Sequence, residues 1–260
     1  GAPARRGLVY LKESKINKSR IYFCAEKELI SINPNNGNLI KSFGKNGKVK
    51  LKKRCKVSPA IIKDKLIIAT VEPAIEVYDL HEGELLWKFY LKDKKNNDKR
   101  NGGKRYDFSG GNPWGGISAD SKRGIIFVTT GNAGFYFNGV NRPGNNKYSN
   151  SVIAIDIFKK KKLWDFQEVS HDIWNFDISA PPILTSITKD NIKIDVVVAV
   201  TKLGNTLVLD RLTGEPIFDF HKKKAPLSRI PGEKTSYYQP NLKIPEPFAK
   251  QFFNRNEITN

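Results

Sequence analysis

The sequence is poor in the residues that build metal centres and in the apolar runs that span membranes. It contains 2 cysteines, 3 histidines and no methionine among 260 residues. Cys24 and Cys55 belong to no Cys-x-x-Cys pair and have no histidine beside them, so a cysteine-based metal site is not expected. They are either two free buried thiols or one disulfide. No run of 18 apolar residues occurs, which excludes a transmembrane helix within these residues.

Acidic residues are also scarce relative to basic ones. The chain has 45 Lys and Arg against 26 Asp and Glu, a formal net charge of +19. Such a charge is typical of proteins that bind nucleic acid. The lysines, however, stand in short separate runs that coincide with expected turns, as at Lys159 to Lys162 and Lys222 to Lys224. The pattern therefore indicates solvated loops and a bias in residue usage, and we expect no nucleic-acid binding.

The most informative feature is a spaced motif, Asp-x3-Gly-x3-Trp-x-Phe, that occurs four times. Its clearest copy is Asp79, Gly83, Trp87 and Phe89. The other copies depart from it at one or more positions, and they are Asn33-Gly37-Phe43, Asp156-Trp164-Phe166 with Lys160 in the glycine position, and Asp210-Gly214-Phe218-Phe220. Fixed internal spacing with uneven separation is typical of one supersecondary unit joined by loops of variable length. The alternative is four unrelated hairpins that share common turn chemistry.

Each copy follows two short β-rich runs and is expected to continue into a third strand. The first runs are 20–24, 66–70, 124–128 and 196–200, and the second are 28–32, 75–78, 151–155 and 206–209. The Asp can accept turn N–H groups, the Gly permits positive φ, and the aromatic ring is suited to packing between neighbouring units.

This arrangement predicts an all-β fold over residues 1–260, a partial β-propeller with blade repeats that end near residues 43, 89, 166 and 220. Four blades do not close a ring, so we expect the chain to be a fragment of a longer protein.

Polar residues gather in long glycine-rich loops between the repeats. The loops at 91–116, 129–150 and 170–182 carry Trp, Asn, His and Asp, and the segment 201–205 adds a Lys. Such side chains on loops above a rigid β scaffold indicate a functional site.

These segments together resemble the pyrroloquinoline-quinone (PQQ) dehydrogenases, and most closely the glucose-dehydrogenase branch. The matching segments are Ala4 to Leu8, Asn112 to Gly116, Thr130 to Asn132, Arg142 to Asn150, His171 to Trp174, Thr201 to Asn205 and Leu209 to Glu215. The resemblance implies an eight-bladed propeller of quinoprotein type with PQQ and a calcium ion in its central funnel. This chain would supply about half of it.

The resemblance also implies roles for particular residues. Trp114 corresponds to the indole on which the quinone stacks, and Trp174 belongs to the same cofactor-binding set. Asn132 corresponds to an oxygen ligand of Ca²⁺, with Glu72 as the candidate acidic ligand. Lys202 corresponds to the basic residue beside the quinone oxygens, where it would stabilise negative charge on the reduced cofactor.

The family's general base follows the Trp of the His-Asp-x-Trp segment, and here that position holds Asn175. An amide cannot accept the substrate proton, so either Asp177 or Asp172 takes this role, or activity is impaired. We favour Asp177, because along a strand it would point to the same face as Asn175.

The expected function is a PQQ- and calcium-dependent dehydrogenase that oxidises a glucose-like sugar or an alcohol, transfers hydride to the quinone and passes electrons to a quinone acceptor. The alternative is a non-catalytic PQQ-like propeller that acts as a protein-binding scaffold. By resemblance the protein would work in the periplasm or on the periplasmic face of the inner membrane. Any membrane association, and the export signal, would lie in segments absent here.

Overall fold

The computed structural model describes residues 7–92, 110–134, 137–252 and 254–257. Most of the loop at 91–116 and two positions of the loop at 129–150 lie outside these residues. The described part is all-β, with strands β1 to β17, one short 3₁₀-helix, η1 (Arg255–Glu257), and no α-helix. No helix in this part is long and apolar enough to cross a membrane.

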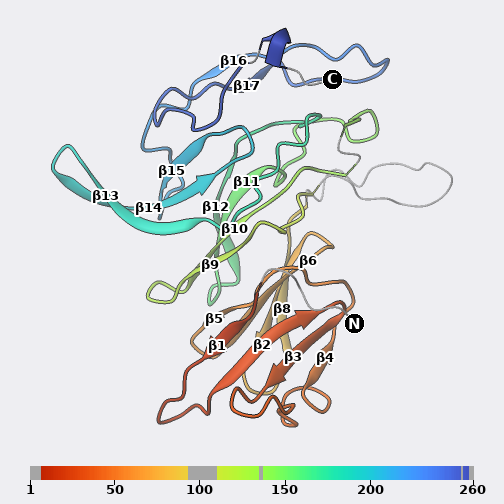
Figure 1. The fold of residues 1–260 in the computed structure, drawn as a ribbon, viewed down its shortest axis with the longest axis vertical. Helices are drawn as coiled ribbons and strands as arrows, with labels where there is room; N and C mark the ends of the chain where they lie inside the picture. Colours follow the sequence, from red (N-terminus) through yellow and green to blue (C-terminus); the bar gives the residue numbers. More distant parts are fainter. Residues whose placement is uncertain (1–6, 93–109, 135–136, 253, 258–260) are drawn as a thin grey trace.

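The strands form antiparallel sheets in chain order, with the first two sheets at one end of the long axis of the molecule and the last hairpin at the other (Figure 1). The first sheet is β1 (Val9–Leu11), β2 (Arg20–Ala25), β3 (Glu28–Ile32) and β4 (Lys48–Lys50), and the second is β5 (Ala60–Ile62), β6 (Lys65–Thr70), β7 (Ala74–Asp79) and β8 (Leu85–Tyr90). The third is β9 (Gly116–Asp120), β10 (Ile125–Thr129), β11 (Ser151–Asp156) and β12 (Lys161–Gln167). A three-stranded sheet follows, β13 (Ile183–Lys189), β14 (Ile192–Val200) and β15 (Thr206–Asp210), and then a hairpin, β16 (Lys222–Lys224) and β17 (Tyr238–Pro240).

Three apolar cores lie between consecutive sheets, as the blades of a propeller require. Strand β6 shows the alternation that produces them. Leu66 and Ile68 enter the core shared with the first sheet, whereas Ile67 and Ala69 enter the core shared with the third. Strand β10 divides its side chains in the same way between the second and fourth sheets. Each central strand is therefore buried on both faces, which explains why its sequence is an unbroken apolar run.

The turn chemistry expected from the repeat is confirmed. Asp79 Oδ1 accepts the backbone N–H groups of His81 and Glu82, both at 2.8 Å. Asp156 and Asp210 cap their own turns in the same manner. The glycine position has positive φ in every copy, including the copy in which Lys160 occupies it with φ 54°.

The aromatic residue of the first copy and that of the third copy each pack on the glycine of the copy that follows. A Cβ on Gly83 would lie 2.9 Å from Phe43 Cε2, and one on Gly214 would lie 2.5 Å from Trp164 Cδ2. The Trp164 indole N–H also donates to the Arg211 carbonyl at 3.2 Å. The aromatic ring therefore joins neighbouring sheets, as its position in the repeat predicts.

Two details of the strand prediction are wrong. Each of the first four sheets begins with an outer strand that the repeat did not reveal, namely β1, β5, β9 and β13. The third strand also differs at two copies. In the first copy it is β4, which begins after Phe43, and in the fourth copy it is absent, because Phe218 and Phe220 lie in an irregular segment. In the fourth copy Pro216, which has no N–H to donate to a ladder, makes only an isolated bridge with Leu209.

Cys24 and Cys55 form a disulfide with a Cα–Cα distance of 5.8 Å. Both residues are buried in the core between the first two sheets. The bond ties β2 to the segment that enters the second sheet, and it settles the choice that the sequence left open.

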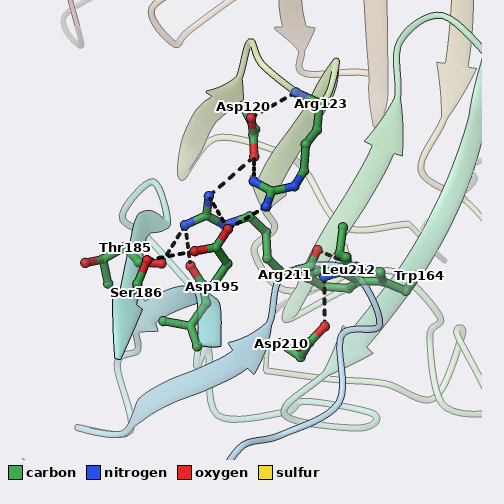
Figure 2. A network of polar contacts seen from close by, with 10 residues as sticks. Asp120, Arg123, Trp164, Thr185, Ser186, Asp195, Asp210, Arg211 and Leu212 are labelled. Carbon is green, nitrogen blue, oxygen red and sulfur yellow. Dashed lines mark hydrogen bonds and ion pairs between the residues drawn. The ribbon is translucent and has the colours of Figure 1, made fainter. Parts of the chain in front are cut away.

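A charged network fastens the fourth sheet to the third (Figure 2). The Arg123 guanidinium bridges Asp120 at 2.8 Å and Asp195 at 2.5 Å. Arg211 reaches Asp120 at 3.4 Å and donates to the Thr185 carbonyl at 2.5 Å. Asp120 and Arg123 belong to β9 and the turn that follows it, whereas Asp195 belongs to β14 of the fourth sheet. The network therefore fixes the two sheets whose loops carry the predicted site.

Candidate functional site

Four loop segments of the third and fourth sheets converge on one place. Asn112 joins the segment that contains Trp114 to the segment that contains Gly131, because its carbonyl accepts the N–H groups of both residues at 2.9 Å. These are the segment before β9 and the segment that follows β10. Ile178 N–H donates to the Thr130 carbonyl at 3.2 Å and brings the loop at 170–182 alongside.

Gly131 allows the closest approach in this arrangement. A Cβ at this position would collide with Trp114 Nε1 and lie 3.0 Å from Asp177 Cγ. Any larger residue would push the indole and the carboxylate away from the backbone. The glycine of the Thr130–Asn132 segment therefore has a packing role at the site itself.

Asp177 connects two of the predicted site residues. Its Oδ1 accepts the backbone N–H of Asn132 at 2.5 Å, and its Oδ2 lies 3.2 Å from Lys202 Nζ. Lys202 Nζ in turn lies 5.8 Å from the ring centre of Trp114. The structure thus brings together Trp114, Asn132, Asp177 and Lys202, which together with Gly131 we call the Trp114 cluster. Asp177 and Asn132 are buried, whereas Lys202 is exposed.

Asn175 contributes its backbone to this cluster. Its carbonyl accepts a hydrogen bond from Lys202 Nζ at 3.2 Å. The prediction that Asp177 and Asn175 share one face of a strand is wrong, because residues 170–182 form no strand and Asn175 has φ 64°. Asp177 reaches Lys202 because the loop bends at Asn175, a residue type that tolerates positive φ.

Asp172, the other candidate base, builds the loop. Its carboxylate accepts the backbone N–H groups of Trp174 and Phe176 and the side-chain amide of Asn150, each at 2.7 Å. The residue is fully buried, and burial raises its pKa even though these hydrogen bonds oppose the shift. Its oxygens are thereby committed to holding the loop in shape.

Trp174 lines a separate cavity of about 200 Å³. Its ring lies 6.0 Å from that of Phe176, and Leu203 and Pro226 complete the apolar wall. Phe176 and Leu203 are the chain neighbours of Asp177 and Lys202, so the cavity adjoins the same two segments. A cofactor-binding role for Trp174 stays a prediction.

The described residues supply only part of a calcium site. Asn132 and Asp177 bring two oxygen-bearing side chains together, but Ca²⁺ takes six to eight oxygens. Within the described ranges, no group of three or more His, Cys, Asp or Glu could hold a metal ion. Glu72 lies in the turn between β6 and β7, where its carbonyl accepts the Thr70 hydroxyl at 2.9 Å. Its role as a ligand stays a prediction.

Two glutamates with buried side chains lie near these loops and carry no sequence signal. Glu233 Oε1 lies 2.6 Å from His171 Nε2, while His171 Nδ1 contacts the Gly144 carbonyl at 2.8 Å. Glu168 lies between β12 and the His171 loop and bonds to Thr201 and Asn205. Neither glutamate belongs to the repeat or to a matching segment, so no sequence pattern drew attention to them.

The stacked sheets and the loop cluster define a partial β-propeller with a candidate site above its third and fourth sheets. The chain belongs to the PQQ family of glucose, ethanol and alcohol dehydrogenases, whose β-propeller domain model matches residues 1–260. This confirms the family that the loop segments resemble.

Individual relatives are also similar over most of this chain. The quinoprotein glucose dehydrogenase of Escherichia coli (strain K12) is 31% identical over 82% of the chain and 29% of its own length. The glycerol dehydrogenase large subunit of Gluconobacter oxydans (strain 621H) is 27% identical over 91% of the chain and 36% of its own length. The chain therefore spans about a third of the length of these curated relatives.

A solved structure supports the fold. A europium-containing methanol dehydrogenase superposes with a TM-score of 0.65 at 24% identity, over 82% of this chain and 40% of that one. At this identity the likeness concerns the fold alone.

The residues of the Trp114 cluster fit a planar, anionic quinone. Trp114 is partly exposed and offers an aromatic face, and Lys202 holds a cation over the same ring at 5.8 Å. An aromatic wall with a few placed polar groups is typical of sites for flat cofactors. Gly131 keeps the backbone beside Trp114 free of any side chain.

Proposed function

We propose that this chain is the part of a PQQ- and calcium-dependent dehydrogenase that carries one wall of the active site. The whole protein would oxidise a glucose-like sugar or an alcohol and pass electrons to a quinone acceptor. The observation that supports this most is the contact of Lys202 Nζ with Asp177 Oδ2 at 3.2 Å, because the same ammonium group lies over the Trp114 ring at 5.8 Å.

Each residue has a distinct task in this proposal. Trp114 provides the face against which the cofactor lies, and PQQ supplies the hydride acceptor. Asp177 takes the proton of the substrate hydroxyl, in place of the amide at Asn175. Lys202 stabilises the negative charge that develops on the cofactor oxygens. Asn132 supplies one oxygen toward Ca²⁺, and the other ligands come from outside the cluster.

We infer a periplasmic location from the kind of enzyme proposed. The Lys at position 202 favours a sugar of the glucose type over a short alcohol, since the resemblance to the glucose-dehydrogenase branch includes this residue.

The test uses the complete gene product. After incubation with PQQ and Ca²⁺, the protein should reduce an artificial dye in the presence of an aldose or a short alcohol. A Trp114→Ala variant should lose saturable PQQ binding, while a Trp164→Phe variant, altered in the core between sheets, should keep it. Absence of turnover with every aldose and alcohol offered would contradict the proposal.

The second candidate function is a protein-binding scaffold of the same architecture. Asn175 in the base position favours it, because a propeller without catalysis has no need of a carboxylate there. Titration of the complete protein with PQQ separates the two functions. A scaffold should show no saturable binding, whereas a dehydrogenase should bind the cofactor with a defined stoichiometry.

A further inference from the structure

Glu168 is a buried carboxyl group that no part of the proposed mechanism uses. It directly follows β12 in the third sheet, and its side chain points into the protein with only 2% of the residue exposed. Its backbone N–H donates to the Asn150 carbonyl at 2.9 Å, which fixes its place at the end of the strand. Burial of a carboxyl group is costly unless its oxygens are hydrogen-bonded.

The side chain reaches across to the fourth sheet. Glu168 Oε1 accepts hydrogen bonds from Thr201 Oγ1 at 3.0 Å and from Asn205 Nδ2 at 2.7 Å. These two residues are the first and last of the turn between β14 and β15, and Thr201 N–H closes that turn on the Asn205 carbonyl at 3.0 Å. One oxygen of Glu168 thus holds both ends of the turn.

Lys202 lies within this turn. Its ammonium group reaches Asp177 and the Asn175 carbonyl, each at 3.2 Å, and lies over Trp114. Lys202 has a long, exposed side chain, and its reach is set by where the turn holds its backbone. Loss of the hydrogen bonds from Thr201 and Asn205 to Glu168 would therefore move the backbone of Lys202 and with it the ammonium group.

We propose that Glu168 is the positioning residue for Lys202: from the neighbouring sheet it holds the turn at 201–205 so that the ammonium group lies between Asp177 and Trp114. The inference rests on the proposed function for the role of Lys202 beside the cofactor. The positioning of the turn by Glu168 does not depend on that role and is tested separately.

The protonation of Glu168 makes the strength of its hydrogen bonds to Thr201 and Asn205 depend on pH. Burial raises the pKa of Glu168 to about 7, with Thr201 and Asn205 opposing the shift and the Asp172 carboxylate adding to it. Its other oxygen, Oε2, is buried and has no hydrogen-bond partner within the described part of the chain. The Asp172 carboxylate acts on Glu168, Arg142 donates to the Asp172 carbonyl, and Lys202 lies in the turn that Glu168 holds. A charged acceptor binds its donors more strongly, so the turn is held more tightly above neutral pH than below it.

The first measurement is the reactivity of Lys202 in the complete protein. Amine acylation followed by mass spectrometry reports how freely each lysine reacts. Glu168→Ala should raise the labelling rate of Lys202 several-fold, because the released turn lets the ammonium leave Asp177. Glu76→Gln is the matched control: Glu76 is also 2% exposed and is paired with Lys88, so its loss should raise labelling of Lys88 and leave Lys202 unchanged.

The second measurement is the dissociation constant for PQQ. Glu168→Ala should weaken binding roughly tenfold, about the effect of one hydrogen bond, because the variant acts on the cofactor only through the position of Lys202. The same change in a Lys202→Ala background should add little, because Glu168 acts through Lys202. In the native protein binding should weaken as pH falls through about 7, and Glu168→Gln should abolish that dependence.

Two results would overturn the proposal. One is a folded Glu168→Ala protein in which Lys202 reacts at the native rate. The other is an effect on PQQ binding that adds fully to that of Lys202→Ala. If the alanine variant does not fold, Thr201→Val removes one of the two hydrogen bonds and must shift Lys202 labelling in the same direction. Failure of the native protein to bind PQQ would contradict the proposed function alone, since Lys202 labelling still measures the positioning of the turn.

Discussion

Asp177 receives the backbone N–H of Asn132 on one oxygen and the ammonium group of Lys202 on the other. The two donors come from different sheets: Asn132 follows β10, whereas Lys202 lies between β14 and β15. Asp177 is therefore the group through which the loops of two blades meet. This carboxylate fixes the loops, and in the proposed function it is also the base for the substrate hydroxyl.

Replacing Asp177 by Asn should separate these two tasks. The amide keeps the shape of the side chain and can still accept the Asn132 N–H, but it cannot take a proton. We expect kcat at saturating PQQ to fall by about 10²- to 10⁴-fold, because general-base catalysis contributes on this scale. PQQ binding should weaken to a smaller extent, because the amide Nδ2 cannot accept the hydrogen bond that Lys202 gives to Asp177 Oδ2. Dye-linked turnover of the complete protein gives kcat, and cofactor titration gives the dissociation constant for PQQ.

Two variants complete the Asp177 experiment. Asp219→Asn, on a side chain that is 90% exposed, should leave both numbers unchanged. Asn175→Asp restores a carboxylate at the family's base position. A large rise in turnover with Asn175→Asp, together with little effect of Asp177→Asn, would contradict the assignment of Asp177 as the base.

Gly131→Ala should disrupt the Trp114 cluster. The added methyl group would collide with Trp114 Nε1, so the indole or the backbone must shift. We expect a loss of about 1–3 kcal/mol in the free energy of unfolding, which is typical of overpacking, and weaker PQQ binding. Urea unfolding followed by tryptophan fluorescence measures the first effect.

The control for this change is Gly37→Asn. A Cβ added at Gly37 would meet no heavy atom within 4 Å, and the residue adopts φ 71°, which asparagine tolerates. This variant should leave PQQ binding intact. Equal losses of binding at both positions would mean that the effect of Gly131→Ala is general destabilisation.

The scaffold could be predicted from the sequence because its signals are local. The Asp of each repeat, or Asn33 in the first copy, caps its own turn two or three residues away, and the residue in the glycine position has positive φ within the same turn. Such signals survive without knowledge of the rest of the fold. The edge strands β1, β5, β9 and β13 could not be predicted, because they are short or partly exposed and carry no motif of their own.

The site was only partly predictable because its contacts join distant segments. Trp114, Asn132 and Lys202 stand in segments that resemble a known family, so their assembly could be anticipated. The bend at Asn175 could not, since a positive φ in a non-glycine residue depends on the surrounding loop. Glu168 gave no signal either, because its partners Thr201 and Asn205 lie more than thirty residues away in the sequence.

The disulfide should contribute strongly to the stability of the first two sheets. Closing a loop with a sequence separation of 31 is worth roughly 3–4 kcal/mol by the chain-entropy argument. We expect the paired change of Cys24 and Cys55 to Ala to lower the free energy of unfolding by about that amount, as measured with urea. A native protein whose unfolding midpoint is the same with and without a reducing agent, after confirmed reduction, would contradict this expectation.

Glu168 should also make the folded state less stable as pH rises. Its pKa is about 7 in the folded protein against an ordinary value of 4.5. Below pH 4.5 the carboxyl is neutral in both the folded and the unfolded chain. Between these two values the folded state keeps a proton that the unfolded chain has released, so the stabilising contribution falls and is lost once pH passes the folded pKa.

The variant Glu168→Gln removes this titration and leaves all other groups in place. Relative to the native protein, the variant should therefore gain about 2–4 kcal/mol of stability between pH 5 and pH 8, as a pKa shift of this size implies. Urea unfolding of both proteins at the two pH values gives the difference directly, because other titrating groups cancel. A difference that stays constant across the range would mean that Glu168 titrates alike in both states, and that the turn bearing Lys202 is held equally well at either pH.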